Sequence, residues 1–173
     1  MYRWCKPPTY GMETTSPPEG GSTQRGVRLI VNGGTVTKSG ADVTQIVTGA
    51  GADIQNGMLV LEAASAVDVD TKMKASYHAA AWDVGQFWST TKDTTHGLGW
   101  VANTTTNKIS IARTLYGDAT LDGTVGLADL TKVQANWGTG TKWNQGDFNY
   151  DSAVGLADLT KVQANWGLLP NLC

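Results

Sequence analysis

The sequence predicts a mixed fold, with a β-rich N-terminal portion followed by an all-α pair of loop–helix repeats. Three observations predict it. The chain of 173 residues contains 21 Gly and only 16% charged residues, a composition that suits short strands and turns. Short apolar segments separated by Gly turns fill much of its first two thirds, as in the end of a β-solenoid or a small sheet. The string VGLADLTKVQANWG then occurs twice, at 125–138 and at 154–167.

These patterns divide the chain into four parts. Residues 1–26 are rich in Pro, Gly, Ser and Thr and have no periodicity, so they are predicted to be disordered or a linker. Residues 27–116 form the β-rich region with one short helix. Residues 117–169 hold the two repeats, at 117–138 and 146–167, and residues 170–173 are a tail.

The composition excludes several classes of protein. The net charge of −2 gives no basic surface for nucleic acid. No apolar run reaches the length of a membrane span, and the N-terminus lacks the apolar segment of a signal peptide. If the chain is secreted, its export signal is missing, and we then expect it to be the C-terminal piece of a longer extracellular or cell-surface protein. Cys5 and Cys173 match neither a disulfide framework nor a zinc pattern; they are free thiols unless the two termini meet.

The β-rich region is predicted element by element. Residues 27–40 contain two short strands around an Asn-Gly-Gly turn, and residues 42–65 repeat this texture with further Gly turns. Good helix formers predict a helix from about residue 69 to residue 80. Strand-like texture returns after it, and the clearest alternation of the chain lies in KISIARTLY at 108–116.

An Asp-rich loop precedes each copy of the repeated string. Alternate side chains of a tight loop point inward, so loop positions 1, 3 and 5 converge, position 7 offers its main-chain carbonyl, and position 12 adds a carboxylate from the following helix. Calcium takes such oxygen ligands. The sequence thus predicts two Ca²⁺ sites, with Asp118, Thr120, Asp122, Thr124 and Asp129 in the first and Asp147, Asn149, Asp151, Ala153 and Asp158 in the second.

The alternative is that these Asp residues only form turns and cap helices. Their identical register in two loops favours calcium. Position 6 requires a positive φ, which Gly123 supplies and Ser152 adopts at a cost. Because Thr120 is a weak ligand, we expect affinities of about 10⁻⁵ to 10⁻³ M, with the second site, which has Asn149, the tighter.

The two copied helices are predicted to pack on each other with pseudo-two-fold symmetry. Each contains four large apolar residues at helical spacing: Leu127, Leu130, Val133 and Trp137 in the first, and Leu156, Leu159, Val162 and Trp166 in the second. Val125 and Val154, at loop position 8, are predicted to pair the loops. The duplicated polar positions predict one partner-binding surface on either helix: Lys132, Gln134 and Asn136, and Lys161, Gln163 and Asn165.

Two such repeats, without the entering helix of a full EF-hand, resemble a dockerin domain over residues 116–169. The match looks closest to the C-terminal repeats of large secreted planctomycete-type bacterial proteins with autotransporter-associated β-repeats, and RTLYGD and HGLGW are similar to the junction that precedes them. The resemblance implies attachment to a cohesin-like domain or another cell-surface component in polysaccharide breakdown. At loop positions 10 and 11, however, Leu127-Ala128 and Leu156-Ala157 stand where the family has a Ser-Thr-like pair.

The predicted function is therefore a non-catalytic calcium-binding module, because neither His78 nor His96 has a nucleophile motif around it. Two alternatives remain. The first alternative is a carbohydrate-binding module that uses Trp82, Trp88 and Trp100 as an aromatic platform, unless these side chains pack in the core. The second alternative is that the chain has a purely structural function, as the C-terminal cap of a β-solenoid. In the calcium interpretation we expect the ion to fold residues 116–169 without a response from the β-rich region.

Overall fold

The computed structural model describes residues 28–168. The predicted linker at 1–26, the predicted tail at 170–173, Cys5 and Cys173 all lie outside these residues. Seven strands and four α-helices form within the described range. None of its helices is long and apolar enough to cross a membrane.

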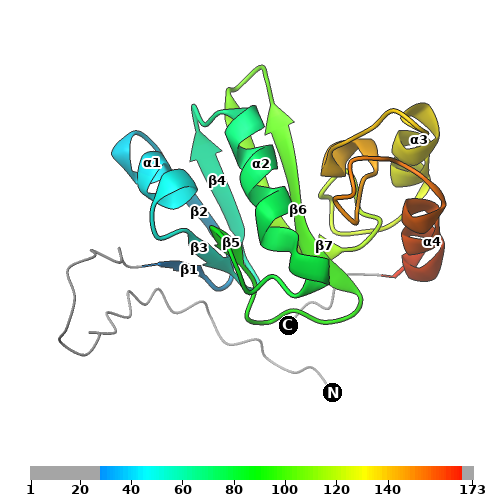
Figure 1. Ribbon diagram of the computed structural model, residues 1–173, viewed down its shortest axis with the longest axis horizontal. Coiled ribbons are helices and arrows are strands. Elements are labelled where there is room, and N and C mark those ends of the chain that lie inside the picture. The colour runs from blue at the N-terminus through cyan, green and yellow to red at the C-terminus, as the bar shows by residue number, and fades with distance from the viewer. Residues whose placement is uncertain (1–27, 169–173) are drawn as a thin grey trace.

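The elements follow one another in a simple order (Figure 1). The first half contains β1 (Leu29–Val31), β2 (Thr35–Lys38), α1 (Ala41–Thr48), β3 (Ala52–Ile54), β4 (Met58–Glu62) and α2 (Ala66–Tyr77). The second half contains β5 (Phe87–Trp88), β6 (His96–Asn103), β7 (Lys108–Leu115), α3 (Leu127–Ala135), a short 3₁₀ turn (Trp143–Gln145) and α4 (Leu156–Asn165).

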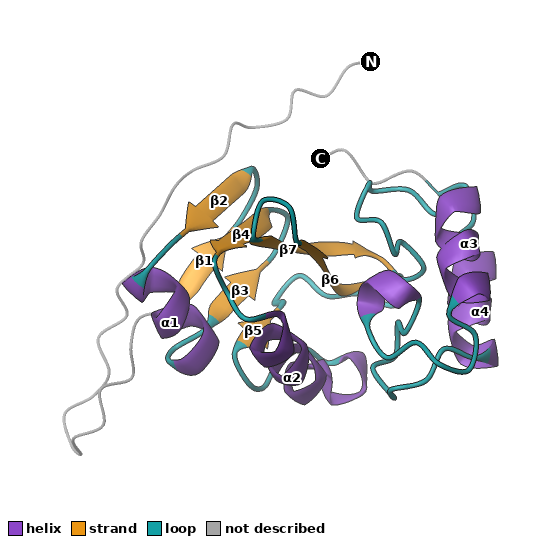
Figure 2. Cartoon of the chain, turned by 90° about the horizontal axis from the view of Figure 1, so that it is seen from above, coloured by secondary structure: helices purple, strands orange, loops and turns teal. Residues whose placement is uncertain are grey.

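The strands form two sheets. The first has the order β1-β3-β5 with parallel pairs, and the second has the order β2-β4-β7-β6. In the second sheet β2 and β4 are parallel, whereas β7 is antiparallel to both of its neighbours. Parallel neighbours need a crossover connection, and α1 and α2 provide it. Figure 2 shows both helices on the same side of the sheets.

The predicted fold class is wrong. We expected a β-rich portion, a β-solenoid end or small sheet, followed by a separate all-α pair of repeats. The chain is instead a mixed α/β structure with two sheets and four short helices, and its repeats share one core with the sheets. The strands around the Asn-Gly-Gly turn do not pair with each other, because Gly33 and Gly34, both with positive φ, direct the chain from one sheet to the other.

Much of the difference between the predicted and the observed N-terminal region lies in its helices. Residues 42–48 are rich in β-branched side chains and were predicted as strand, but they lie in α1, which buries Val43, Ile46 and Val47. The predicted helix at 69–80 is present as α2 but begins earlier. Its N-terminus is capped by Ser65, whose hydroxyl oxygen accepts from the Asp68 N–H at 3.2 Å, and it ends at His78 with φ 42°.

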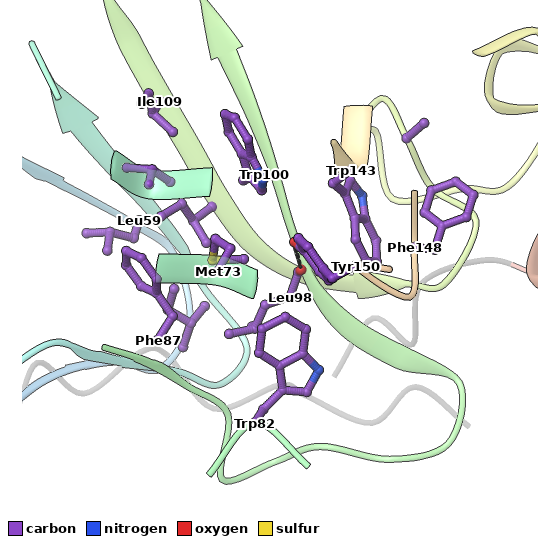
Figure 3. Packing of buried hydrophobic residues seen from close by; sticks show 14 of the residues in the cluster. Leu59, Met73, Trp82, Phe87, Leu98, Trp100, Ile109, Trp143, Phe148 and Tyr150 are labelled. Atoms are coloured by element: carbon purple, nitrogen blue, oxygen red, sulfur yellow. Dashed lines mark hydrogen bonds between the residues drawn. The ribbon is translucent and has the colours of Figure 1, made fainter. Parts of the chain in front are cut away.

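A single hydrophobic cluster joins the sheets to the repeats (Figure 3). It contains Leu59 and Leu98 from the second sheet, Met73 from α2, and Trp143 and Phe148 from the C-terminal third. Sequential strands and remote aromatic side chains therefore contribute to the same core. The described chain is one packed unit rather than a β domain followed by a helical domain.

The three central Trp residues do not form an exposed platform. Trp82 and Trp100 are fully buried, and the Arg28 guanidinium lies 3.7 Å from the ring centroid of Trp88. Stacking on a sugar requires accessible ring faces. Trp82 and Trp100 therefore pack in the core, and they cannot serve as the exposed aromatic platform that the carbohydrate-binding alternative requires.

Candidate metal centre

The two Asp-rich loops have the same backbone conformation. Position 6 has a positive φ in both, 88° at Gly123 and 70° at Ser152, as predicted. Position 4 has a positive φ as well, 60° at Leu121 and 56° at Tyr150, which the sequence did not predict. Different residues thus adopt one loop shape, and that shape costs strain at three non-Gly positions.

The carboxylate at loop position 1 is completely buried in both loops. Asp118 Oδ2 accepts from the Gly123 N–H and Asp147 Oδ2 accepts from the Ser152 N–H, each at 3.0 Å. The other oxygen is poorly satisfied. Asp118 Oδ1 accepts only long bonds of 3.3 Å, and Asp147 Oδ1 is buried with no hydrogen-bond partner among the described residues.

The carboxylate at position 12 joins the start of its loop to the start of its helix. Asp129 Oδ2 accepts from the Gly126 N–H at 2.9 Å, and its Oδ1 accepts from the Ala119 N–H at 2.9 Å. Asp158 makes the equivalent bonds to the N–H groups of Gly155 and Phe148. These two residues therefore cap helices, which was the alternative to calcium binding. Each carboxylate oxygen has more than one lone pair, so capping leaves room for a cation.

Position 3 of the first loop lies between two carboxylates. The Thr120 hydroxyl is 3.3 Å from Asp118 Oδ1 and 3.1 Å from Asp129 Oδ1. It therefore brings positions 1, 3 and 12 of the first loop together. In the second loop the amide of Asn149 instead donates to Asp151 Oδ2 at 2.7 Å.

The carboxylate at position 5 is exposed and bonds within its own turn. Asp122 Oδ1 accepts from the N–H and the hydroxyl of Thr124, at 2.9 and 2.7 Å. Asp151 Oδ1 accepts from the Ala153 N–H at 2.9 Å. Nowhere in residues 28–168 do three carboxylate, imidazole or thiol side chains gather as a metal-binding group. A cation here thus requires hydroxyl, amide and main-chain carbonyl oxygens as well.

The buried carboxylates carry a charge that the surrounding residues do not neutralise. None of the ion pairs between described residues involves the six loop carboxylates. Burial, followed by the charge of Asp158, raises the pKa of Asp147 to about 6. Burial also raises the pKa of Asp118 and of Asp158, whereas the bond from the Thr124 hydroxyl lowers that of Asp122. A buried, unpaired carboxylate oxygen fits a hard cation.

The two repeats contact each other reciprocally. The Gly138 N–H donates to the Val154 carbonyl at 2.9 Å, and the Gly167 N–H donates to the Val125 carbonyl at 3.0 Å. Each residue before a loop is also a glycine packed on the helix of the other repeat. A Cβ at Gly117 would lie 3.0 Å from Cα of Val162, and one at Gly146 would lie 2.8 Å from Cγ2 of Val133.

Only the inner half of each predicted apolar stripe is buried. Val133 and Val162 are fully buried, and Leu130 and Leu159 pack partly on the core. The outer residues are exposed: Leu127 by 71%, Leu156 by 72%, and Trp137 and Trp166 by 49% each. The prediction that all four residues of each stripe pack between the helices is therefore wrong, because the Leu residues begin the helices and the Trp residues lie beyond the helix ends.

The duplicated polar positions are not equivalent in the structure. Lys132, Gln134 and Gln163 are exposed, and Asn136 is half-buried. Asn165 is buried, and its amide donates to the Tyr116 carbonyl at 2.7 Å. The Lys161 ammonium lies 4.4 Å from the ring centroid of Tyr116. Because Asn165 and Lys161 of α4 have these contacts with Tyr116 while their counterparts Asn136 and Lys132 are half-buried and exposed, the two helices do not present the same surface.

Three further residues hold the loops in place, and the sequence analysis did not single them out. The Thr114 hydroxyl donates to Asp118 Oδ2. The Trp143 indole N–H donates to the Asp118 carbonyl at 2.6 Å, and the Tyr150 hydroxyl donates to the Leu98 carbonyl at 2.8 Å. The alternating glycines of HGLGW were an available signal, because glycine on one face of a strand permits close approach of a large ring.

The two loops thus combine a shared conformation with buried carboxylates, and they differ in how the sheet supports them. Their geometry alone carries the interpretation as a metal centre. Comparisons with family models, with curated proteins and with solved structures found no match to this chain.

Proposed function

We propose that this chain is a non-catalytic module that binds one calcium ion in each Asp-rich loop. The observation that carries the proposal is Asp147, whose Oδ1 is buried and unpaired in a loop with the same conformation as its neighbour. Asp118, Thr120, Asp122, Asp129 and the Thr124 carbonyl would hold one ion, and Asp147, Asn149, Asp151, Asp158 and the Ala153 carbonyl the other. The bound ion supplies positive charge that offsets the carboxylates.

The module is proposed to attach or anchor a larger extracellular protein. The exposed large apolar side chains of both repeats, Leu127, Trp137, Leu156 and Trp166, support this role because they are available for a protein contact. The resemblance to dockerin domains suggests a cohesin-like domain or another cell-surface component as the partner, in the context of polysaccharide breakdown. The Leu-Ala pairs at loop positions 10 and 11 favour a partner with an apolar surface.

Titration calorimetry of the full chain with calcium chloride tests the metal sites. We expect two binding events, and the variants Asp118→Asn and Asp147→Asn should each remove one. Asp42→Asn changes charge equally at an exposed position of α1 and serves as the control. The absence of any binding heat and of any change in melting temperature would refute calcium binding.

A pull-down from the source organism's extracellular fraction, in calcium and in chelator, tests the attachment role. A partner should be retained only in calcium, and Leu127→Ser combined with Leu156→Ser should release it. Both side chains are more than two thirds exposed, so the double variant should keep its calcium affinity. Retention that is unchanged by chelator and by the double variant would contradict the proposal.

A further inference from the structure

Three side chains join the candidate calcium loops to the rest of the molecule: Thr114 of β7, Trp143 of the connection between the repeats, and Tyr150 of the second loop. We propose that these residues position the loops, so that calcium binding and ordering of the four-stranded sheet are one linked process. The inference rests on the proposed function. It replaces the expectation that the region before residue 116 does not respond to calcium.

The first ligand of the first loop is held at three points. The Asp118 N–H donates to the Leu115 carbonyl at 3.1 Å, the Asp118 carbonyl accepts from the Trp143 indole, and Asp118 Oδ2 accepts from the Thr114 hydroxyl. Thr114 and Leu115 belong to β7, which pairs with both β4 and β6. The sheet therefore determines where this carboxylate lies and which of its oxygens accepts the Thr114 hydroxyl.

Trp143 fills a space that only a glycine on β6 leaves open. A Cβ at Gly99 would lie 2.5 Å from Cε2 of its indole ring. The ring is fully buried, with its centroid 5.9 Å from that of Tyr116 and 5.0 Å from that of Phe148. The same ring that bonds to Asp118 is thus packed on the sheet, and a shift of the sheet moves the ligand.

Tyr150 connects the second loop to β6 and α2. Its hydroxyl donates to the Leu98 carbonyl, as the dashed line in Figure 3 shows. Its ring centroid is 5.5 Å from that of Tyr77 and 5.6 Å from that of Trp82. The proposed ligands Asn149 and Asp151 flank it in the sequence, so the position of the ring fixes the position of both.

These contacts predict how calcium affects the sheet. A ligand that binds only the native arrangement stabilises every part that the arrangement requires. If the loops need β6 and β7 in place, calcium will suppress opening of these strands. If the repeats were an independent unit, only the repeats would be stabilised.

Hydrogen exchange of the full chain, followed by mass spectrometry in chelator and in millimolar calcium, tests the linkage. We expect calcium to slow exchange in β6 and β7 as well as in residues 117–168. Protection confined to residues 117–168 would overturn the inference while leaving calcium binding intact. No protection anywhere would refute the proposed function together with the inference.

A substitution at Thr114 tests the positioning role at the first loop. Thr114→Val removes the hydroxyl and keeps the shape, so calcium affinity should fall about tenfold at the first loop and stay unchanged at the second. Thr114→Ser should restore the affinity. Thr131→Val is the control, because the Thr131 hydroxyl bonds to the Leu127 carbonyl on the exposed face of α3. Wild-type affinity in Thr114→Val would overturn the role of Thr114.

A substitution on the sheet tests the same linkage from the other side. Gly99→Ala displaces the Trp143 ring without touching any proposed ligand, and it should weaken calcium binding at both loops. Gly49→Ala is the control, since its Cβ would lie 2.5 Å from the Gln45 carbonyl oxygen at the C-terminal end of α1, outside the four-stranded sheet. Equal weakening in both variants would mean general destabilisation and would overturn the role of Trp143.

Discussion

Ser152 has the conformation that Gly123 has in the other loop, with φ of 70° against 88°. A residue with a side chain is strained in this region, and glycine is not. The loop shape is therefore imposed on Ser152 by its surroundings, including the bond from its N–H to Asp147. One residue of the pair follows its local preference and the other does not.

Exchanging these two residue types should have opposite effects on stability. We expect Ser152→Gly to raise the free energy of unfolding by about 1 kcal/mol, and Gly123→Ser to lower it by about the same amount. Urea denaturation of both variants in calcium provides the measurement. A loss of stability in Ser152→Gly would show that the Ser side chain contributes more than its strain costs.

The raised pKa of Asp147 predicts how stability depends on pH in the absence of metal. Its ordinary value is 3.8 and its value in the folded chain is about 6, so the folded state favours the neutral carboxyl. The stability gained from protonation is complete below pH 3.8 and is lost as the pH rises through about 6. In chelator, the melting temperature should therefore fall across this interval.

Melting curves at several pH values, with chelator and with calcium, test this dependence. Calcium favours the ionised carboxylate, so it should reduce or reverse the fall. Asp147→Asn cannot titrate at this position and should show a weaker pH dependence in chelator. A wild-type melting temperature that rises steadily from pH 4 to pH 6 in chelator would contradict the assigned pKa.

At the scale of elements, the helices α3 and α4 bury and expose the same apolar positions of the repeated string. Each helix buries its central Val and exposes its first Leu, although both were assigned to one apolar stripe. The Gly residues that end the copies bond to the opposite loop. Contact between the repeats is thus made by a few central side chains and by main-chain groups at the helix ends.

The exposed and buried members of the stripe should respond differently to truncation. Val133→Ala and Val162→Ala should each lower the free energy of unfolding by about 2 kcal/mol, because both side chains are fully buried. Leu127→Ala and Leu156→Ala should change it by less than about 0.5 kcal/mol. Chemical denaturation of the four variants in calcium gives the comparison, and equal losses in both pairs would refute the assignment.

Local signals in the sequence predicted some elements and missed others. The alternation of KISIARTLY predicted β7, and the helix formers of 69–80 predicted α2, because in each case pattern and propensity agree. Residues 42–48 were misassigned because β-branched side chains favour strands, while the spacing of Val43, Ile46 and Val47 favours a helix. The pairing of β1 with β3 depends on contacts between remote strands, which no local pattern contains.

The sequence predicted the residue types and the positive φ angles of the candidate site, but not the contacts that hold its loops against the sheet. Loop numbering placed a positive φ at Gly123 and Ser152, and the structure has it there. The contacts of Asp118 with Thr114 and Trp143 depend on how the repeats meet the sheet. They could not be derived from the repeated string, because neither Thr114 nor Trp143 belongs to it.

At the scale of the whole molecule, one core contains both sheets and both repeats. A fragment of residues 116–168 would expose Trp143 and Tyr150, which are buried against β6, α2 and each other in the full chain. We therefore expect this fragment to melt at a lower temperature than the full chain in millimolar calcium. Circular dichroism of both provides the test, and equal melting temperatures would contradict the shared core.

The reciprocal contact between the repeats also affects how the chain folds. Because α3 and α4 come from identical strings, the helix sequences themselves do not determine which repeat lies in which place. The contacts that differ between the repeats include the bond from Asn165 to the Tyr116 carbonyl and the bond from Trp143, in the connection, to the Asp118 carbonyl. Tyr116 and Trp143 both pack against glycines of β6. We therefore expect the contacts of Tyr116 and Trp143 with β6, rather than the helix sequences, to determine which repeat lies in which place.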